Sequence, residues 1–316
     1  MYDVAIIGGG AAAHGAALYA MQYRLETVMV LEEFGGETAT ASVVENYPGH
    51  VSIDGLELMK TMETQVKKLG AEVIRGKAER VERDRRCFVI GVGGSELEAK
   101  SVIMAAGRER RTLGLPHEKE WLGLGISYCP TCDAPLYADQ TVGIVGGGDS
   151  AVKGALLLAK YAKQVYVIHR GAKLRGEPIN NERLQEASNV SILFNTRVTA
   201  LQGEEGLRAV VLDPPYQGEE ELPLDGLFVE IGAEPRVELA KSLGGALDES
   251  GYIQVDSMMR TNVPGFFAAG DVTNASGSLK QVITSAAQGV LAATEAYKHV
   301  SEGGDFCDRH ARPFKL

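Results

Sequence analysis

The chain has 316 residues, of which 45% are hydrophobic and 23% charged, and its formal net charge is −10. This length is sufficient for two domains with separate cores, and the acidic balance argues against nucleic acid or an anionic membrane as the main partner. No apolar run reaches transmembrane length, and a strand-like segment follows the first Met too closely for a signal peptide. The four cysteines do not form the pattern of a secreted disulfide scaffold, so we expect a cytoplasmic protein.

The first segment has the pattern of a dinucleotide-binding fold. A buried strand at Val4–Ile7 runs into a glycine turn and then into a helix rich in small residues. The three fingerprint positions are Gly8, Gly10 and Ala13. The next strand, Thr27–Leu31, ends in Glu32, where an acid would accept hydrogen bonds from a ribose diol. His14 lies just inside the helix with no catalytic set around it, and is predicted to be a spectator.

The following stretch leads to a first linker. Residues 34–49 are rich in turn residues and could wrap a cofactor. Leu56–Leu69 has helical periodicity, and Ala71–Ala105 alternates strand-like runs with turns, which predicts a small β-hairpin region. Val102–Gly107 is predicted to be a buried strand, and Gly114–Pro116 a linker.

Two cysteines separated by two residues, Cys129 and Cys132, are followed directly by Asp133. This arrangement places a dithiol beside a carboxyl group that could carry a proton. A zinc site is disfavoured, because the remaining cysteines, Cys87 and Cys307, are isolated in the sequence. A structural disulfide would close a very small loop and constrain the unfolded chain little. Redox chemistry is therefore the favoured interpretation.

A second glycine turn follows the dithiol, after the strand Thr141–Val145. Its fingerprint positions are Gly146, Gly148 and Ala151. The next strand, Gln164–Ile168, ends in His169 and Arg170, with Arg175 shortly after. Cations at this position can pair with a ribose 2′-phosphate, which an acid would repel. The alternative is a basic turn that faces solvent.

The remainder of the chain is predicted to complete both nucleotide-binding units. Predicted strands cover Val190–Phe194, Val198–Gln202, Arg208–Leu212 and Gly226–Gly232. Gly244–Gly245 suits a second linker, Gly265–Asp271 a strand ending in Gly-Asp, and the segment from about Lys280 to His299 a helix. The tail Ser301–Leu316 is expected to be loosely ordered.

The motifs together resemble thioredoxin reductases of the small, dimeric, FAD-containing type, up to about residue 300. The matching motifs are Gly8–Ala13, Val44–Gly49, Ser127–Asp133, Gly146–Ala151 and Ala269–Val272. The resemblance implies an α/β fold with two Rossmann-like nucleotide-binding domains of the three-layer ββα form, the second inserted into the first. The expected domains are 1–113 and 244–316 for FAD, and 114–243 for NAD(P)H and the dithiol.

The resemblance also implies roles for individual residues. Cys129 would attack the partner's disulfide, Cys132 would face the flavin, and Asp133 would act as acid and base. Asp271 would lie near the FAD pyrophosphate and ribityl chain. The implied FAD-binding residues are Gly8, Gly10, Ala13, Glu32, Gly36, Asn46, Gly107, Asp271, Lys280, Gln281 and Val282. The implied NADPH-binding residues are Gly146, Gly148, Asp149, Ser150, Ala151, His169, Arg170 and Arg175. No metal ligand is expected.

The chain departs from the family pattern at three places. Pro130 stands where Ala is usual and could be the first-turn residue of a helix, Gly171 replaces the second arginine of His-Arg-Arg, and the tail is dissimilar. We expect a homodimer that passes electrons from NADPH, with NADH as an alternative, through FAD and the dithiol to a thioredoxin- or glutaredoxin-like protein. Another donor such as ferredoxin, which the Gly171 departure leaves open, and a redox sensor are the competing interpretations.

Overall fold

The computed structural model describes residues 1–41, 44–85, 87–277 and 279–303 and divides into two compact units. The first unit combines Met1–Glu109 with the chain from Pro235 onward, and the second, Arg110–Glu234, is inserted between these two parts. The α/β fold class with an inserted second unit is confirmed. The chain passes between the units at 109/110 and 234/235, whereas the sequence suggested 113/114 and 243/244. Most of the tail, with Cys307, lies outside the described residues.

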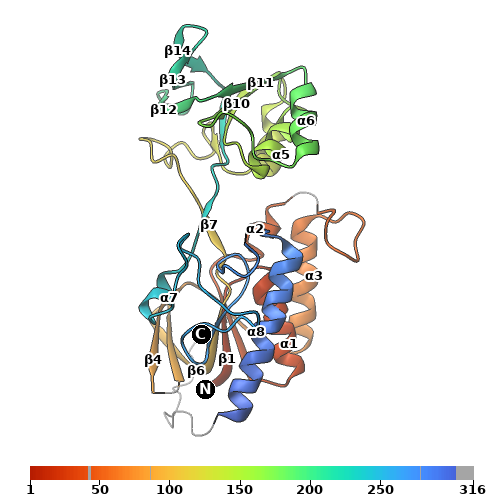
Figure 1. Cartoon of the computed structure of the whole chain (residues 1–316), viewed down its shortest axis with the longest axis vertical. Coiled ribbons are helices and arrows are strands. Elements are labelled where there is room, and N and C mark those ends of the chain that lie inside the picture. The colour runs from red at the N-terminus through yellow and green to blue at the C-terminus, as the bar shows by residue number, and fades with distance from the viewer. Residues whose placement is uncertain (42–43, 86, 278, 304–316) are drawn as a thin grey trace. The chain divides into compact units, whose positions relative to one another are not determined.

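The first unit is built on a mixed sheet in which, among the described residues, seven strands take part (Figure 1). Its strands are β1 (Tyr2–Ile7), β2 (Thr27–Leu31), β3 (Glu72–Arg75), β4 (Ala78–Asp84), β5 (Cys87–Val92), β6 (Ser95–Met104) and β17 (Phe266–Ala268). The order is β3-β2-β1-β6-β5-β4, and β17 pairs with β6. Strands β1, β2, β3 and β17 run parallel to their partners, while β4, β5 and β6 pair antiparallel.

Helices from opposite ends of the chain cover one face of this sheet (Figure 1). They are α1 (Ala11–Gln22), α3 (Gly55–Lys68) and α8 (Val282–Glu302), with short helices α2 (Gly36–Ala39) and α7 (Glu238–Ser242) elsewhere in the unit. Helices α1 and α8 approach closely because their contact faces carry small residues. A Cβ atom on Gly289 would lie 2.0 Å from the Ala12 carbonyl oxygen, and one on Gly15 would lie 2.5 Å from that of Ala286. Only glycine permits this distance between the helices.

The second unit contains a parallel sheet and a separate antiparallel sheet (Figure 1). The parallel strands, in the order β11-β10-β9-β15-β8, are β8 (Ile126–Ser127), β9 (Thr141–Val145), β10 (Gln164–His169), β11 (Val190–Phe194) and β15 (Gly226–Val229). The antiparallel strands are β12 (Arg197–Gln202), β13 (Ala209–Tyr216) and β14 (Glu219–Pro223). The helices are α4 (Pro130–Asp133), η1 (Ala134–Tyr137), α5 (Asp149–Leu158) and α6 (Pro178–Glu186).

Several elements differ from the sequence prediction. Strand β3, expected in a hairpin region, instead pairs in parallel with β2, so the antiparallel pairs in the described part of this sheet are β4 with β5 and β5 with β6. Strand β14 and helix α2 were not predicted. The expected linker at Gly244–Gly245 follows α7, which belongs to the first unit, where the Ser242 hydroxyl donates to the Val81 carbonyl.

The chain passes from one unit to the other within two short strands that pair with each other, β7 (Arg108–Arg110) and β16 (Ala233–Pro235). The backbone N–H of Arg111 donates to the Gly232 carbonyl, and that of Arg236 donates to the Gly107 carbonyl. Within the described ranges, no helix is long and apolar enough to span a membrane.

Candidate functional site

Cys129 and Cys132 form a disulfide at the start of helix α4, with their Cα atoms 5.3 Å apart. Cys129 is the N-cap residue and Pro130 occupies the first turn, which confirms the position expected for this proline. The N–H of Cys132 points at the Cys129 sulfur at 3.2 Å. Cys129 is half-buried and Cys132 exposed within this unit. The two cysteines therefore lie in the first turn of a helix, where the N–H of Cys132 is shared between the Cys129 sulfur and the Cys129 carbonyl, at 3.2 and 3.1 Å.

Asp133 is held by a serine that the sequence analysis gave no role. The hydroxyl of Ser127 donates to Asp133 Oδ2 at 2.7 Å and accepts the backbone N–H of Cys129 at 3.0 Å. Ser127 is buried at the end of β8. The Ser-Tyr-Cys motif contained this residue, but only the fold shows that its hydroxyl turns back toward Asp133.

Pro130 packs the dithiol helix against the nucleotide helix α5. A Cβ atom on Gly154 would lie 2.9 Å from Pro130 Cγ and 2.9 Å from Ile144 Cδ1. Pro130 is itself buried. Because the space over Gly154 is filled by the proline ring, α4 and α5 are packed as one body.

A buried carboxylate secures the chain that leads to the dithiol. Glu118, which is 2% exposed, accepts the backbone N–H groups of Leu113 and Gly114, each at 2.8 Å. It also accepts the hydroxyl of Tyr128 at 2.5 Å. Burial, together with this bond, raises the pKa of Tyr128 above its usual value. The residue before Cys129 is thus tied to the start of the second unit, and sequence reasoning had no signal for this contact.

The first glycine turn fits a phosphate group. Gly8 has φ +139°, and a Cβ atom there would lie 2.1 Å from the Ala105 carbonyl oxygen, so only glycine can form this turn. Gly10 is the N-cap of α1 and makes no side-chain cap, and α1 has no acid in its first turn. The N–H groups at the start of a helix that has no side-chain cap attract anions. Gly36 lies close to the start of α1, because a Cβ atom on Gly36 would lie 3.6 Å from Gly10 Cα.

Other expected FAD-binding residues lie around this turn or on the strands and helices next to it. Asn46 donates to the side-chain oxygen of Gln281 at 2.9 Å, which joins segments 235 residues apart. Gln281 caps α8, and Val282 is its first residue. Glu32 follows β2 with 47% of its side chain exposed, as a ribose ligand requires. Ala13 is buried on α1, and Gly107, with φ +65°, connects β6 to β7.

Asp271, an expected FAD-binding residue, is paired with Arg108, a contact that the sequence did not predict. Arg108 binds Asp271 Oδ2 through two nitrogens, at 2.9 and 3.2 Å, and the hydroxyl of Ser285 donates to Oδ1 at 3.0 Å. Burial lowers the pKa of Lys280, an effect that Asp271 opposes. Lys280 also lies 4.4 Å from the centre of the Tyr252 ring and donates to the Thr273 carbonyl. Arg108 offsets the charge that Asp271 would present to an anionic cofactor.

The second glycine turn has the same form. Gly146 has φ +150°, and a Cβ atom there would meet the Glu230 carbonyl oxygen at 2.2 Å and Ala151 Cβ at 2.7 Å. Gly148 is the N-cap of α5, makes no side-chain cap and has open space at its Cβ position. In the first turn of α5, the carboxylate of Asp149 is paired with Lys153 at 2.7 Å, and Ser150 beside it is exposed.

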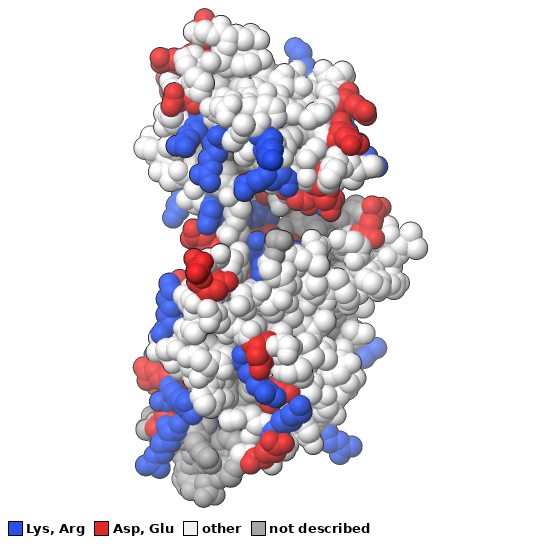
Figure 2. Space-filling model, in the orientation of Figure 1, with Lys and Arg blue, Asp and Glu red and all other residues white. Residues whose placement is uncertain are grey.

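The basic residues after β10 meet this turn in different ways. His169 is buried, with its ring against Gly147, and burial lowers its pKa, while Arg175 and Arg170 act in the same direction. The backbone N–H of Arg175 donates to the Gly147 carbonyl at 2.6 Å. Arg170 and Arg175 are both exposed. Basic side chains gather on the visible face of this unit (Figure 2). The buried ring of His169 therefore packs against the glycine turn, and the exposed side chains of Arg170 and Arg175 remain available to bind an anion.

Comparison with known proteins decides the family. Residues 2–289 match the family described as pyridine nucleotide-disulphide oxidoreductase. The chain belongs to this family. This oxidoreductase is 39% identical to a thioredoxin reductase of Peptoclostridium acidaminophilum over 309 residues, covering 95% of this chain and 97% of the relative. The structure of Lactococcus lactis thioredoxin reductase matches with TM-score 0.88 and 35% identity, covering 96% of this chain and all of that one. That of T. acidophilum matches with TM-score 0.85 and 34% identity, covering 94% and 98%.

The expected resemblance to thioredoxin reductases is confirmed, and the protein is an oxidoreductase whose disulfide is its redox centre. Membership implies a flavin and a pyridine nucleotide. The residues around both glycine turns fit such groups, because each turn combines a close backbone approach with a helix start that has no side-chain cap.

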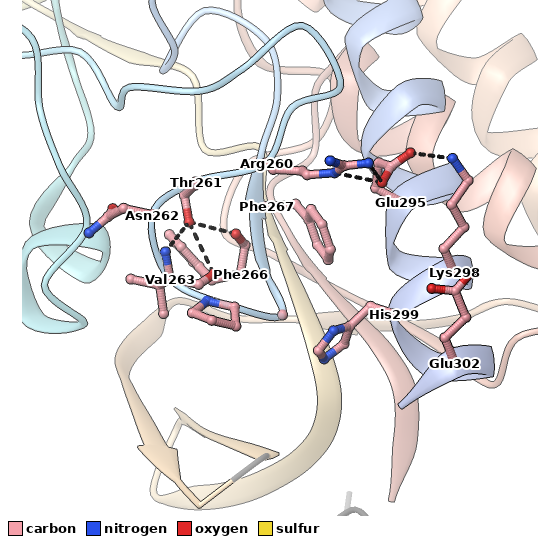
Figure 3. Close-up of a pocket in the computed structure, with 12 residues that line it drawn as sticks. Arg260, Thr261, Asn262, Val263, Phe266, Phe267, Glu295, Lys298, His299 and Glu302 are labelled. Carbon is pink, nitrogen blue, oxygen red and sulfur yellow. Dashed lines mark hydrogen bonds and ion pairs between the residues drawn. The ribbon is translucent and has the colours of Figure 1, made fainter. Parts of the chain in front are cut away.

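A further hollow of about 400 Å³ in the oxidoreductase's first unit lies beside the C-terminal part of α8 (Figure 3). Arg260 and Lys298 bind Glu295 from both sides, at 2.6 and 2.7 Å. Burial opposes ionisation of Glu295, yet the hydrogen bonds from Lys298 and Arg260 lower its pKa. None of the expected cofactor residues lines this hollow, and Arg260, Glu295 and Lys298 in its wall pair with each other. We assign it no part in the redox site.

Proposed function

We propose that this oxidoreductase is a thioredoxin reductase that takes electrons from NADPH, passes them through FAD to the Cys129–Cys132 disulfide, and reduces a thioredoxin-like protein. The observation that carries the proposal is the disulfide itself, formed at a helix start beside Asp133 and packed through Pro130 on the nucleotide helix. A disulfide built only for stability would need neither the carboxyl nor the adjoining nucleotide turn.

The chain's own residues supply thiol activation and proton transfer. Once the disulfide is reduced, the N–H of Cys132 that points at Cys129 Sγ favours the thiolate form of Cys129, because a hydrogen bond to the charged state stabilises it. Asp133 follows Cys132 directly in the chain, and its role in the proposal is to give a proton to a leaving sulfur. The flavin, when bound, transfers the electron pair from the nicotinamide to the disulfide.

The identity of both cofactors is part of the proposal. For FAD, the support is the first turn, where the start of α1 has no side-chain cap and no acid, and the charge of Asp271 is balanced by Arg108. For NADPH, the support is the exposed pair Arg170 and Arg175 at the end of β10, where no acid follows the strand. Gly171 leaves this anion site without a third cation, so NADH is the natural competitor.

A thioredoxin- or glutaredoxin-like partner, a homodimeric assembly and a cytoplasmic location belong to the same proposal. The partner follows from the dithiol and from the relatives, which are named thioredoxin reductases. The dimer and the compartment rest on the likeness to that family and on the cysteine usage of the chain.

The test is steady-state turnover of the purified protein with bacterial thioredoxin as the disulfide, and with NADPH, NADH or reduced ferredoxin as the donor. We expect sustained NADPH oxidation, and we expect Cys129→Ser and Cys132→Ser to abolish it while the bound flavin is still reduced by NADPH. Cys87→Ala, which removes a buried thiol from the other unit, is the matched control and should retain turnover. Single-turnover behaviour would favour a redox sensor, and turnover with ferredoxin alone would favour the other donor.

A further inference from the structure

Ser127 forms hydrogen bonds on both sides of the Cys129–Cys132 pair, with the backbone of Cys129 and with the side chain of Asp133. Its backbone is fixed in the sheet, where β8 pairs in parallel with β15 and Ser127 stands opposite Phe228. Its side chain is 2% exposed. The hydroxyl lies 2.7 Å from Asp133 Oδ2 and 3.0 Å from the Cys129 nitrogen. One rigid hydroxyl group therefore touches the backbone of the first cysteine and the carboxylate that follows the second.

The direction of both hydrogen bonds follows from the chemistry of the groups. An amide N–H can only donate, and an ionised carboxylate can only accept. The single hydroxyl proton of Ser127 must therefore point at Asp133, and a lone pair must face Cys129. The bond uses Oδ2, and the carboxylate keeps Oδ1 to exchange a proton with sulfur. Rotation of the Asp133 side chain would break a short bond to a charged acceptor, which is worth about 1.5–3 kcal/mol.

We propose that Ser127 is a positioning residue for the thiol–disulfide step, and that it acts by fixing the Asp133 carboxylate relative to Cys129. The inference rests on the proposed function. In that step one dithiol sulfur attacks the partner's disulfide, whose S–S bond breaks as a mixed disulfide forms. The other sulfur then attacks the first, the Cys129–Cys132 bond forms again, and the partner leaves with two electrons and two protons. Asp133 carries a proton from the dithiol to a leaving sulfur over a distance that Ser127 sets.

The expected effect is on the rate of this step and not on binding. General acid catalysis contributes roughly 10²–10⁴ in rate, and a small misplacement of a catalytic group forfeits part of it. Ser127→Ala should therefore lower kcat for thioredoxin reduction by roughly 10- to 100-fold, with KM for thioredoxin unchanged. Reduction of the bound flavin by NADPH, followed in a rapid-mixing experiment, should keep its wild-type rate. Ser127→Thr keeps the hydroxyl and should recover most of the lost rate.

The decisive comparison is the double variant Ser127→Ala/Asp133→Asn. If Ser127 acts through Asp133, the double variant is no slower than Asp133→Asn alone. Ser191→Ala, which removes a hydroxyl bonded to Gln164 in the same unit, is the matched control and should retain full turnover. Trp121 is buried in this unit, and its fluorescence reports whether each variant is folded. If Ser127→Ala does not fold, the turnover of Ser127→Thr tests the inference instead.

Three results would overturn the inference. They are wild-type turnover in Ser127→Ala, losses that multiply in the double variant, or an equal slowing of flavin reduction and of thioredoxin reduction. A failure of the proposed function looks different, because the wild-type protein itself would then not turn over thioredoxin.

Discussion

The contact between Pro130 and Gly154 allows a quantitative test of how the dithiol helix is joined to the nucleotide helix. Gly154→Ala places a methyl group 2.9 Å from Pro130 Cγ and 2.9 Å from Ile144 Cδ1. Overpacking of this kind costs ~1–3 kcal/mol, whereas alanine in a helix interior is favoured over glycine by about 1 kcal/mol. The net effect on the free energy of unfolding should be a loss of about 0–2 kcal/mol.

The same substitution should behave differently when Pro130 is already alanine. The ring atom Cγ is then gone, and the Cβ atom that alanine keeps lies at 3.4 Å, an ordinary contact distance. The remaining close neighbour is the terminal methyl of Ile144, which can rotate away. Gly154→Ala should then be neutral or stabilising by up to about 1 kcal/mol. The gain from helix propensity is the same in both backgrounds, so the coupling free energy equals the overpacking cost that the ring imposes, about 1–3 kcal/mol in favour of the double variant.

Urea unfolding measures this coupling directly, because the chain's single tryptophan, Trp121, is buried in the second unit and reports on that unit. Pro178→Ala is the matched control: this proline also lies at the start of a helix, α6, but is not among the atoms nearest Gly154. Gly154→Ala should add independently to Pro178→Ala. Simple additivity with Pro130→Ala, or stabilisation of the wild-type background by Gly154→Ala, would refute the packing argument.

Two further predictions follow from the charged and titratable groups. Arg170→Ala and Arg175→Ala should each lower the NADPH/NADH ratio of kcat/KM by roughly tenfold, since each removes a charge-assisted contact of about 1.5 kcal/mol. The exposed Arg183→Ala should leave that ratio unchanged, and an unaltered ratio in the first two variants would exclude the phosphate site. Burial lowers the pKa of His14, so the unfolded chain binds a proton that the folded one does not as pH falls below about 6.5. Thermal stability should therefore decline below about that pH, and His14→Gln should reduce the decline; an identical pH dependence would show that His14 does not cause it.

The parts of the protein that local patterns specify were predictable. Both glycine turns are such parts, because a positive φ at Gly8 and at Gly146 combines with a neighbouring carbonyl oxygen where a Cβ atom would stand. The start of helix α4 is another, because Pro130 is suited to a first turn. The sequence signal for each is local, because the glycine spacing and Pro130 can be read within a few positions, although the carbonyl oxygens that crowd Gly8 and Gly146 come from the distant residues Ala105 and Glu230.

Features that depend on distant partners were not predictable from the sequence. The bond between Arg108 and Asp271 joins positions 163 residues apart. Strand β14 has three successive acids, Glu219–Glu221, and is a strand only because β13 pairs with it. The closeness of Gly171 to the buried His169 is also visible only in the fold, where a Cβ atom on Gly171 would lie 2.7 Å from His169 Nε2.

The contact between α1 and α8 has a consequence for the order in which the protein is made. Helix α1 precedes the inserted unit in the chain, while strand β17 and helix α8 follow it, so they are translated later. The inserted unit, Arg110–Glu234, is therefore complete in the nascent chain while the first unit still lacks the strand beside β6 and the helix that covers Gly15. During synthesis the redox disulfide segment can reach its native packing before the segments around Asp271 and Gln281 have been translated. If the flavin binds where we propose, its site is completed only after the redox segment has folded, and Cys129 and Cys132 are then exposed to other thiols before the flavin binds.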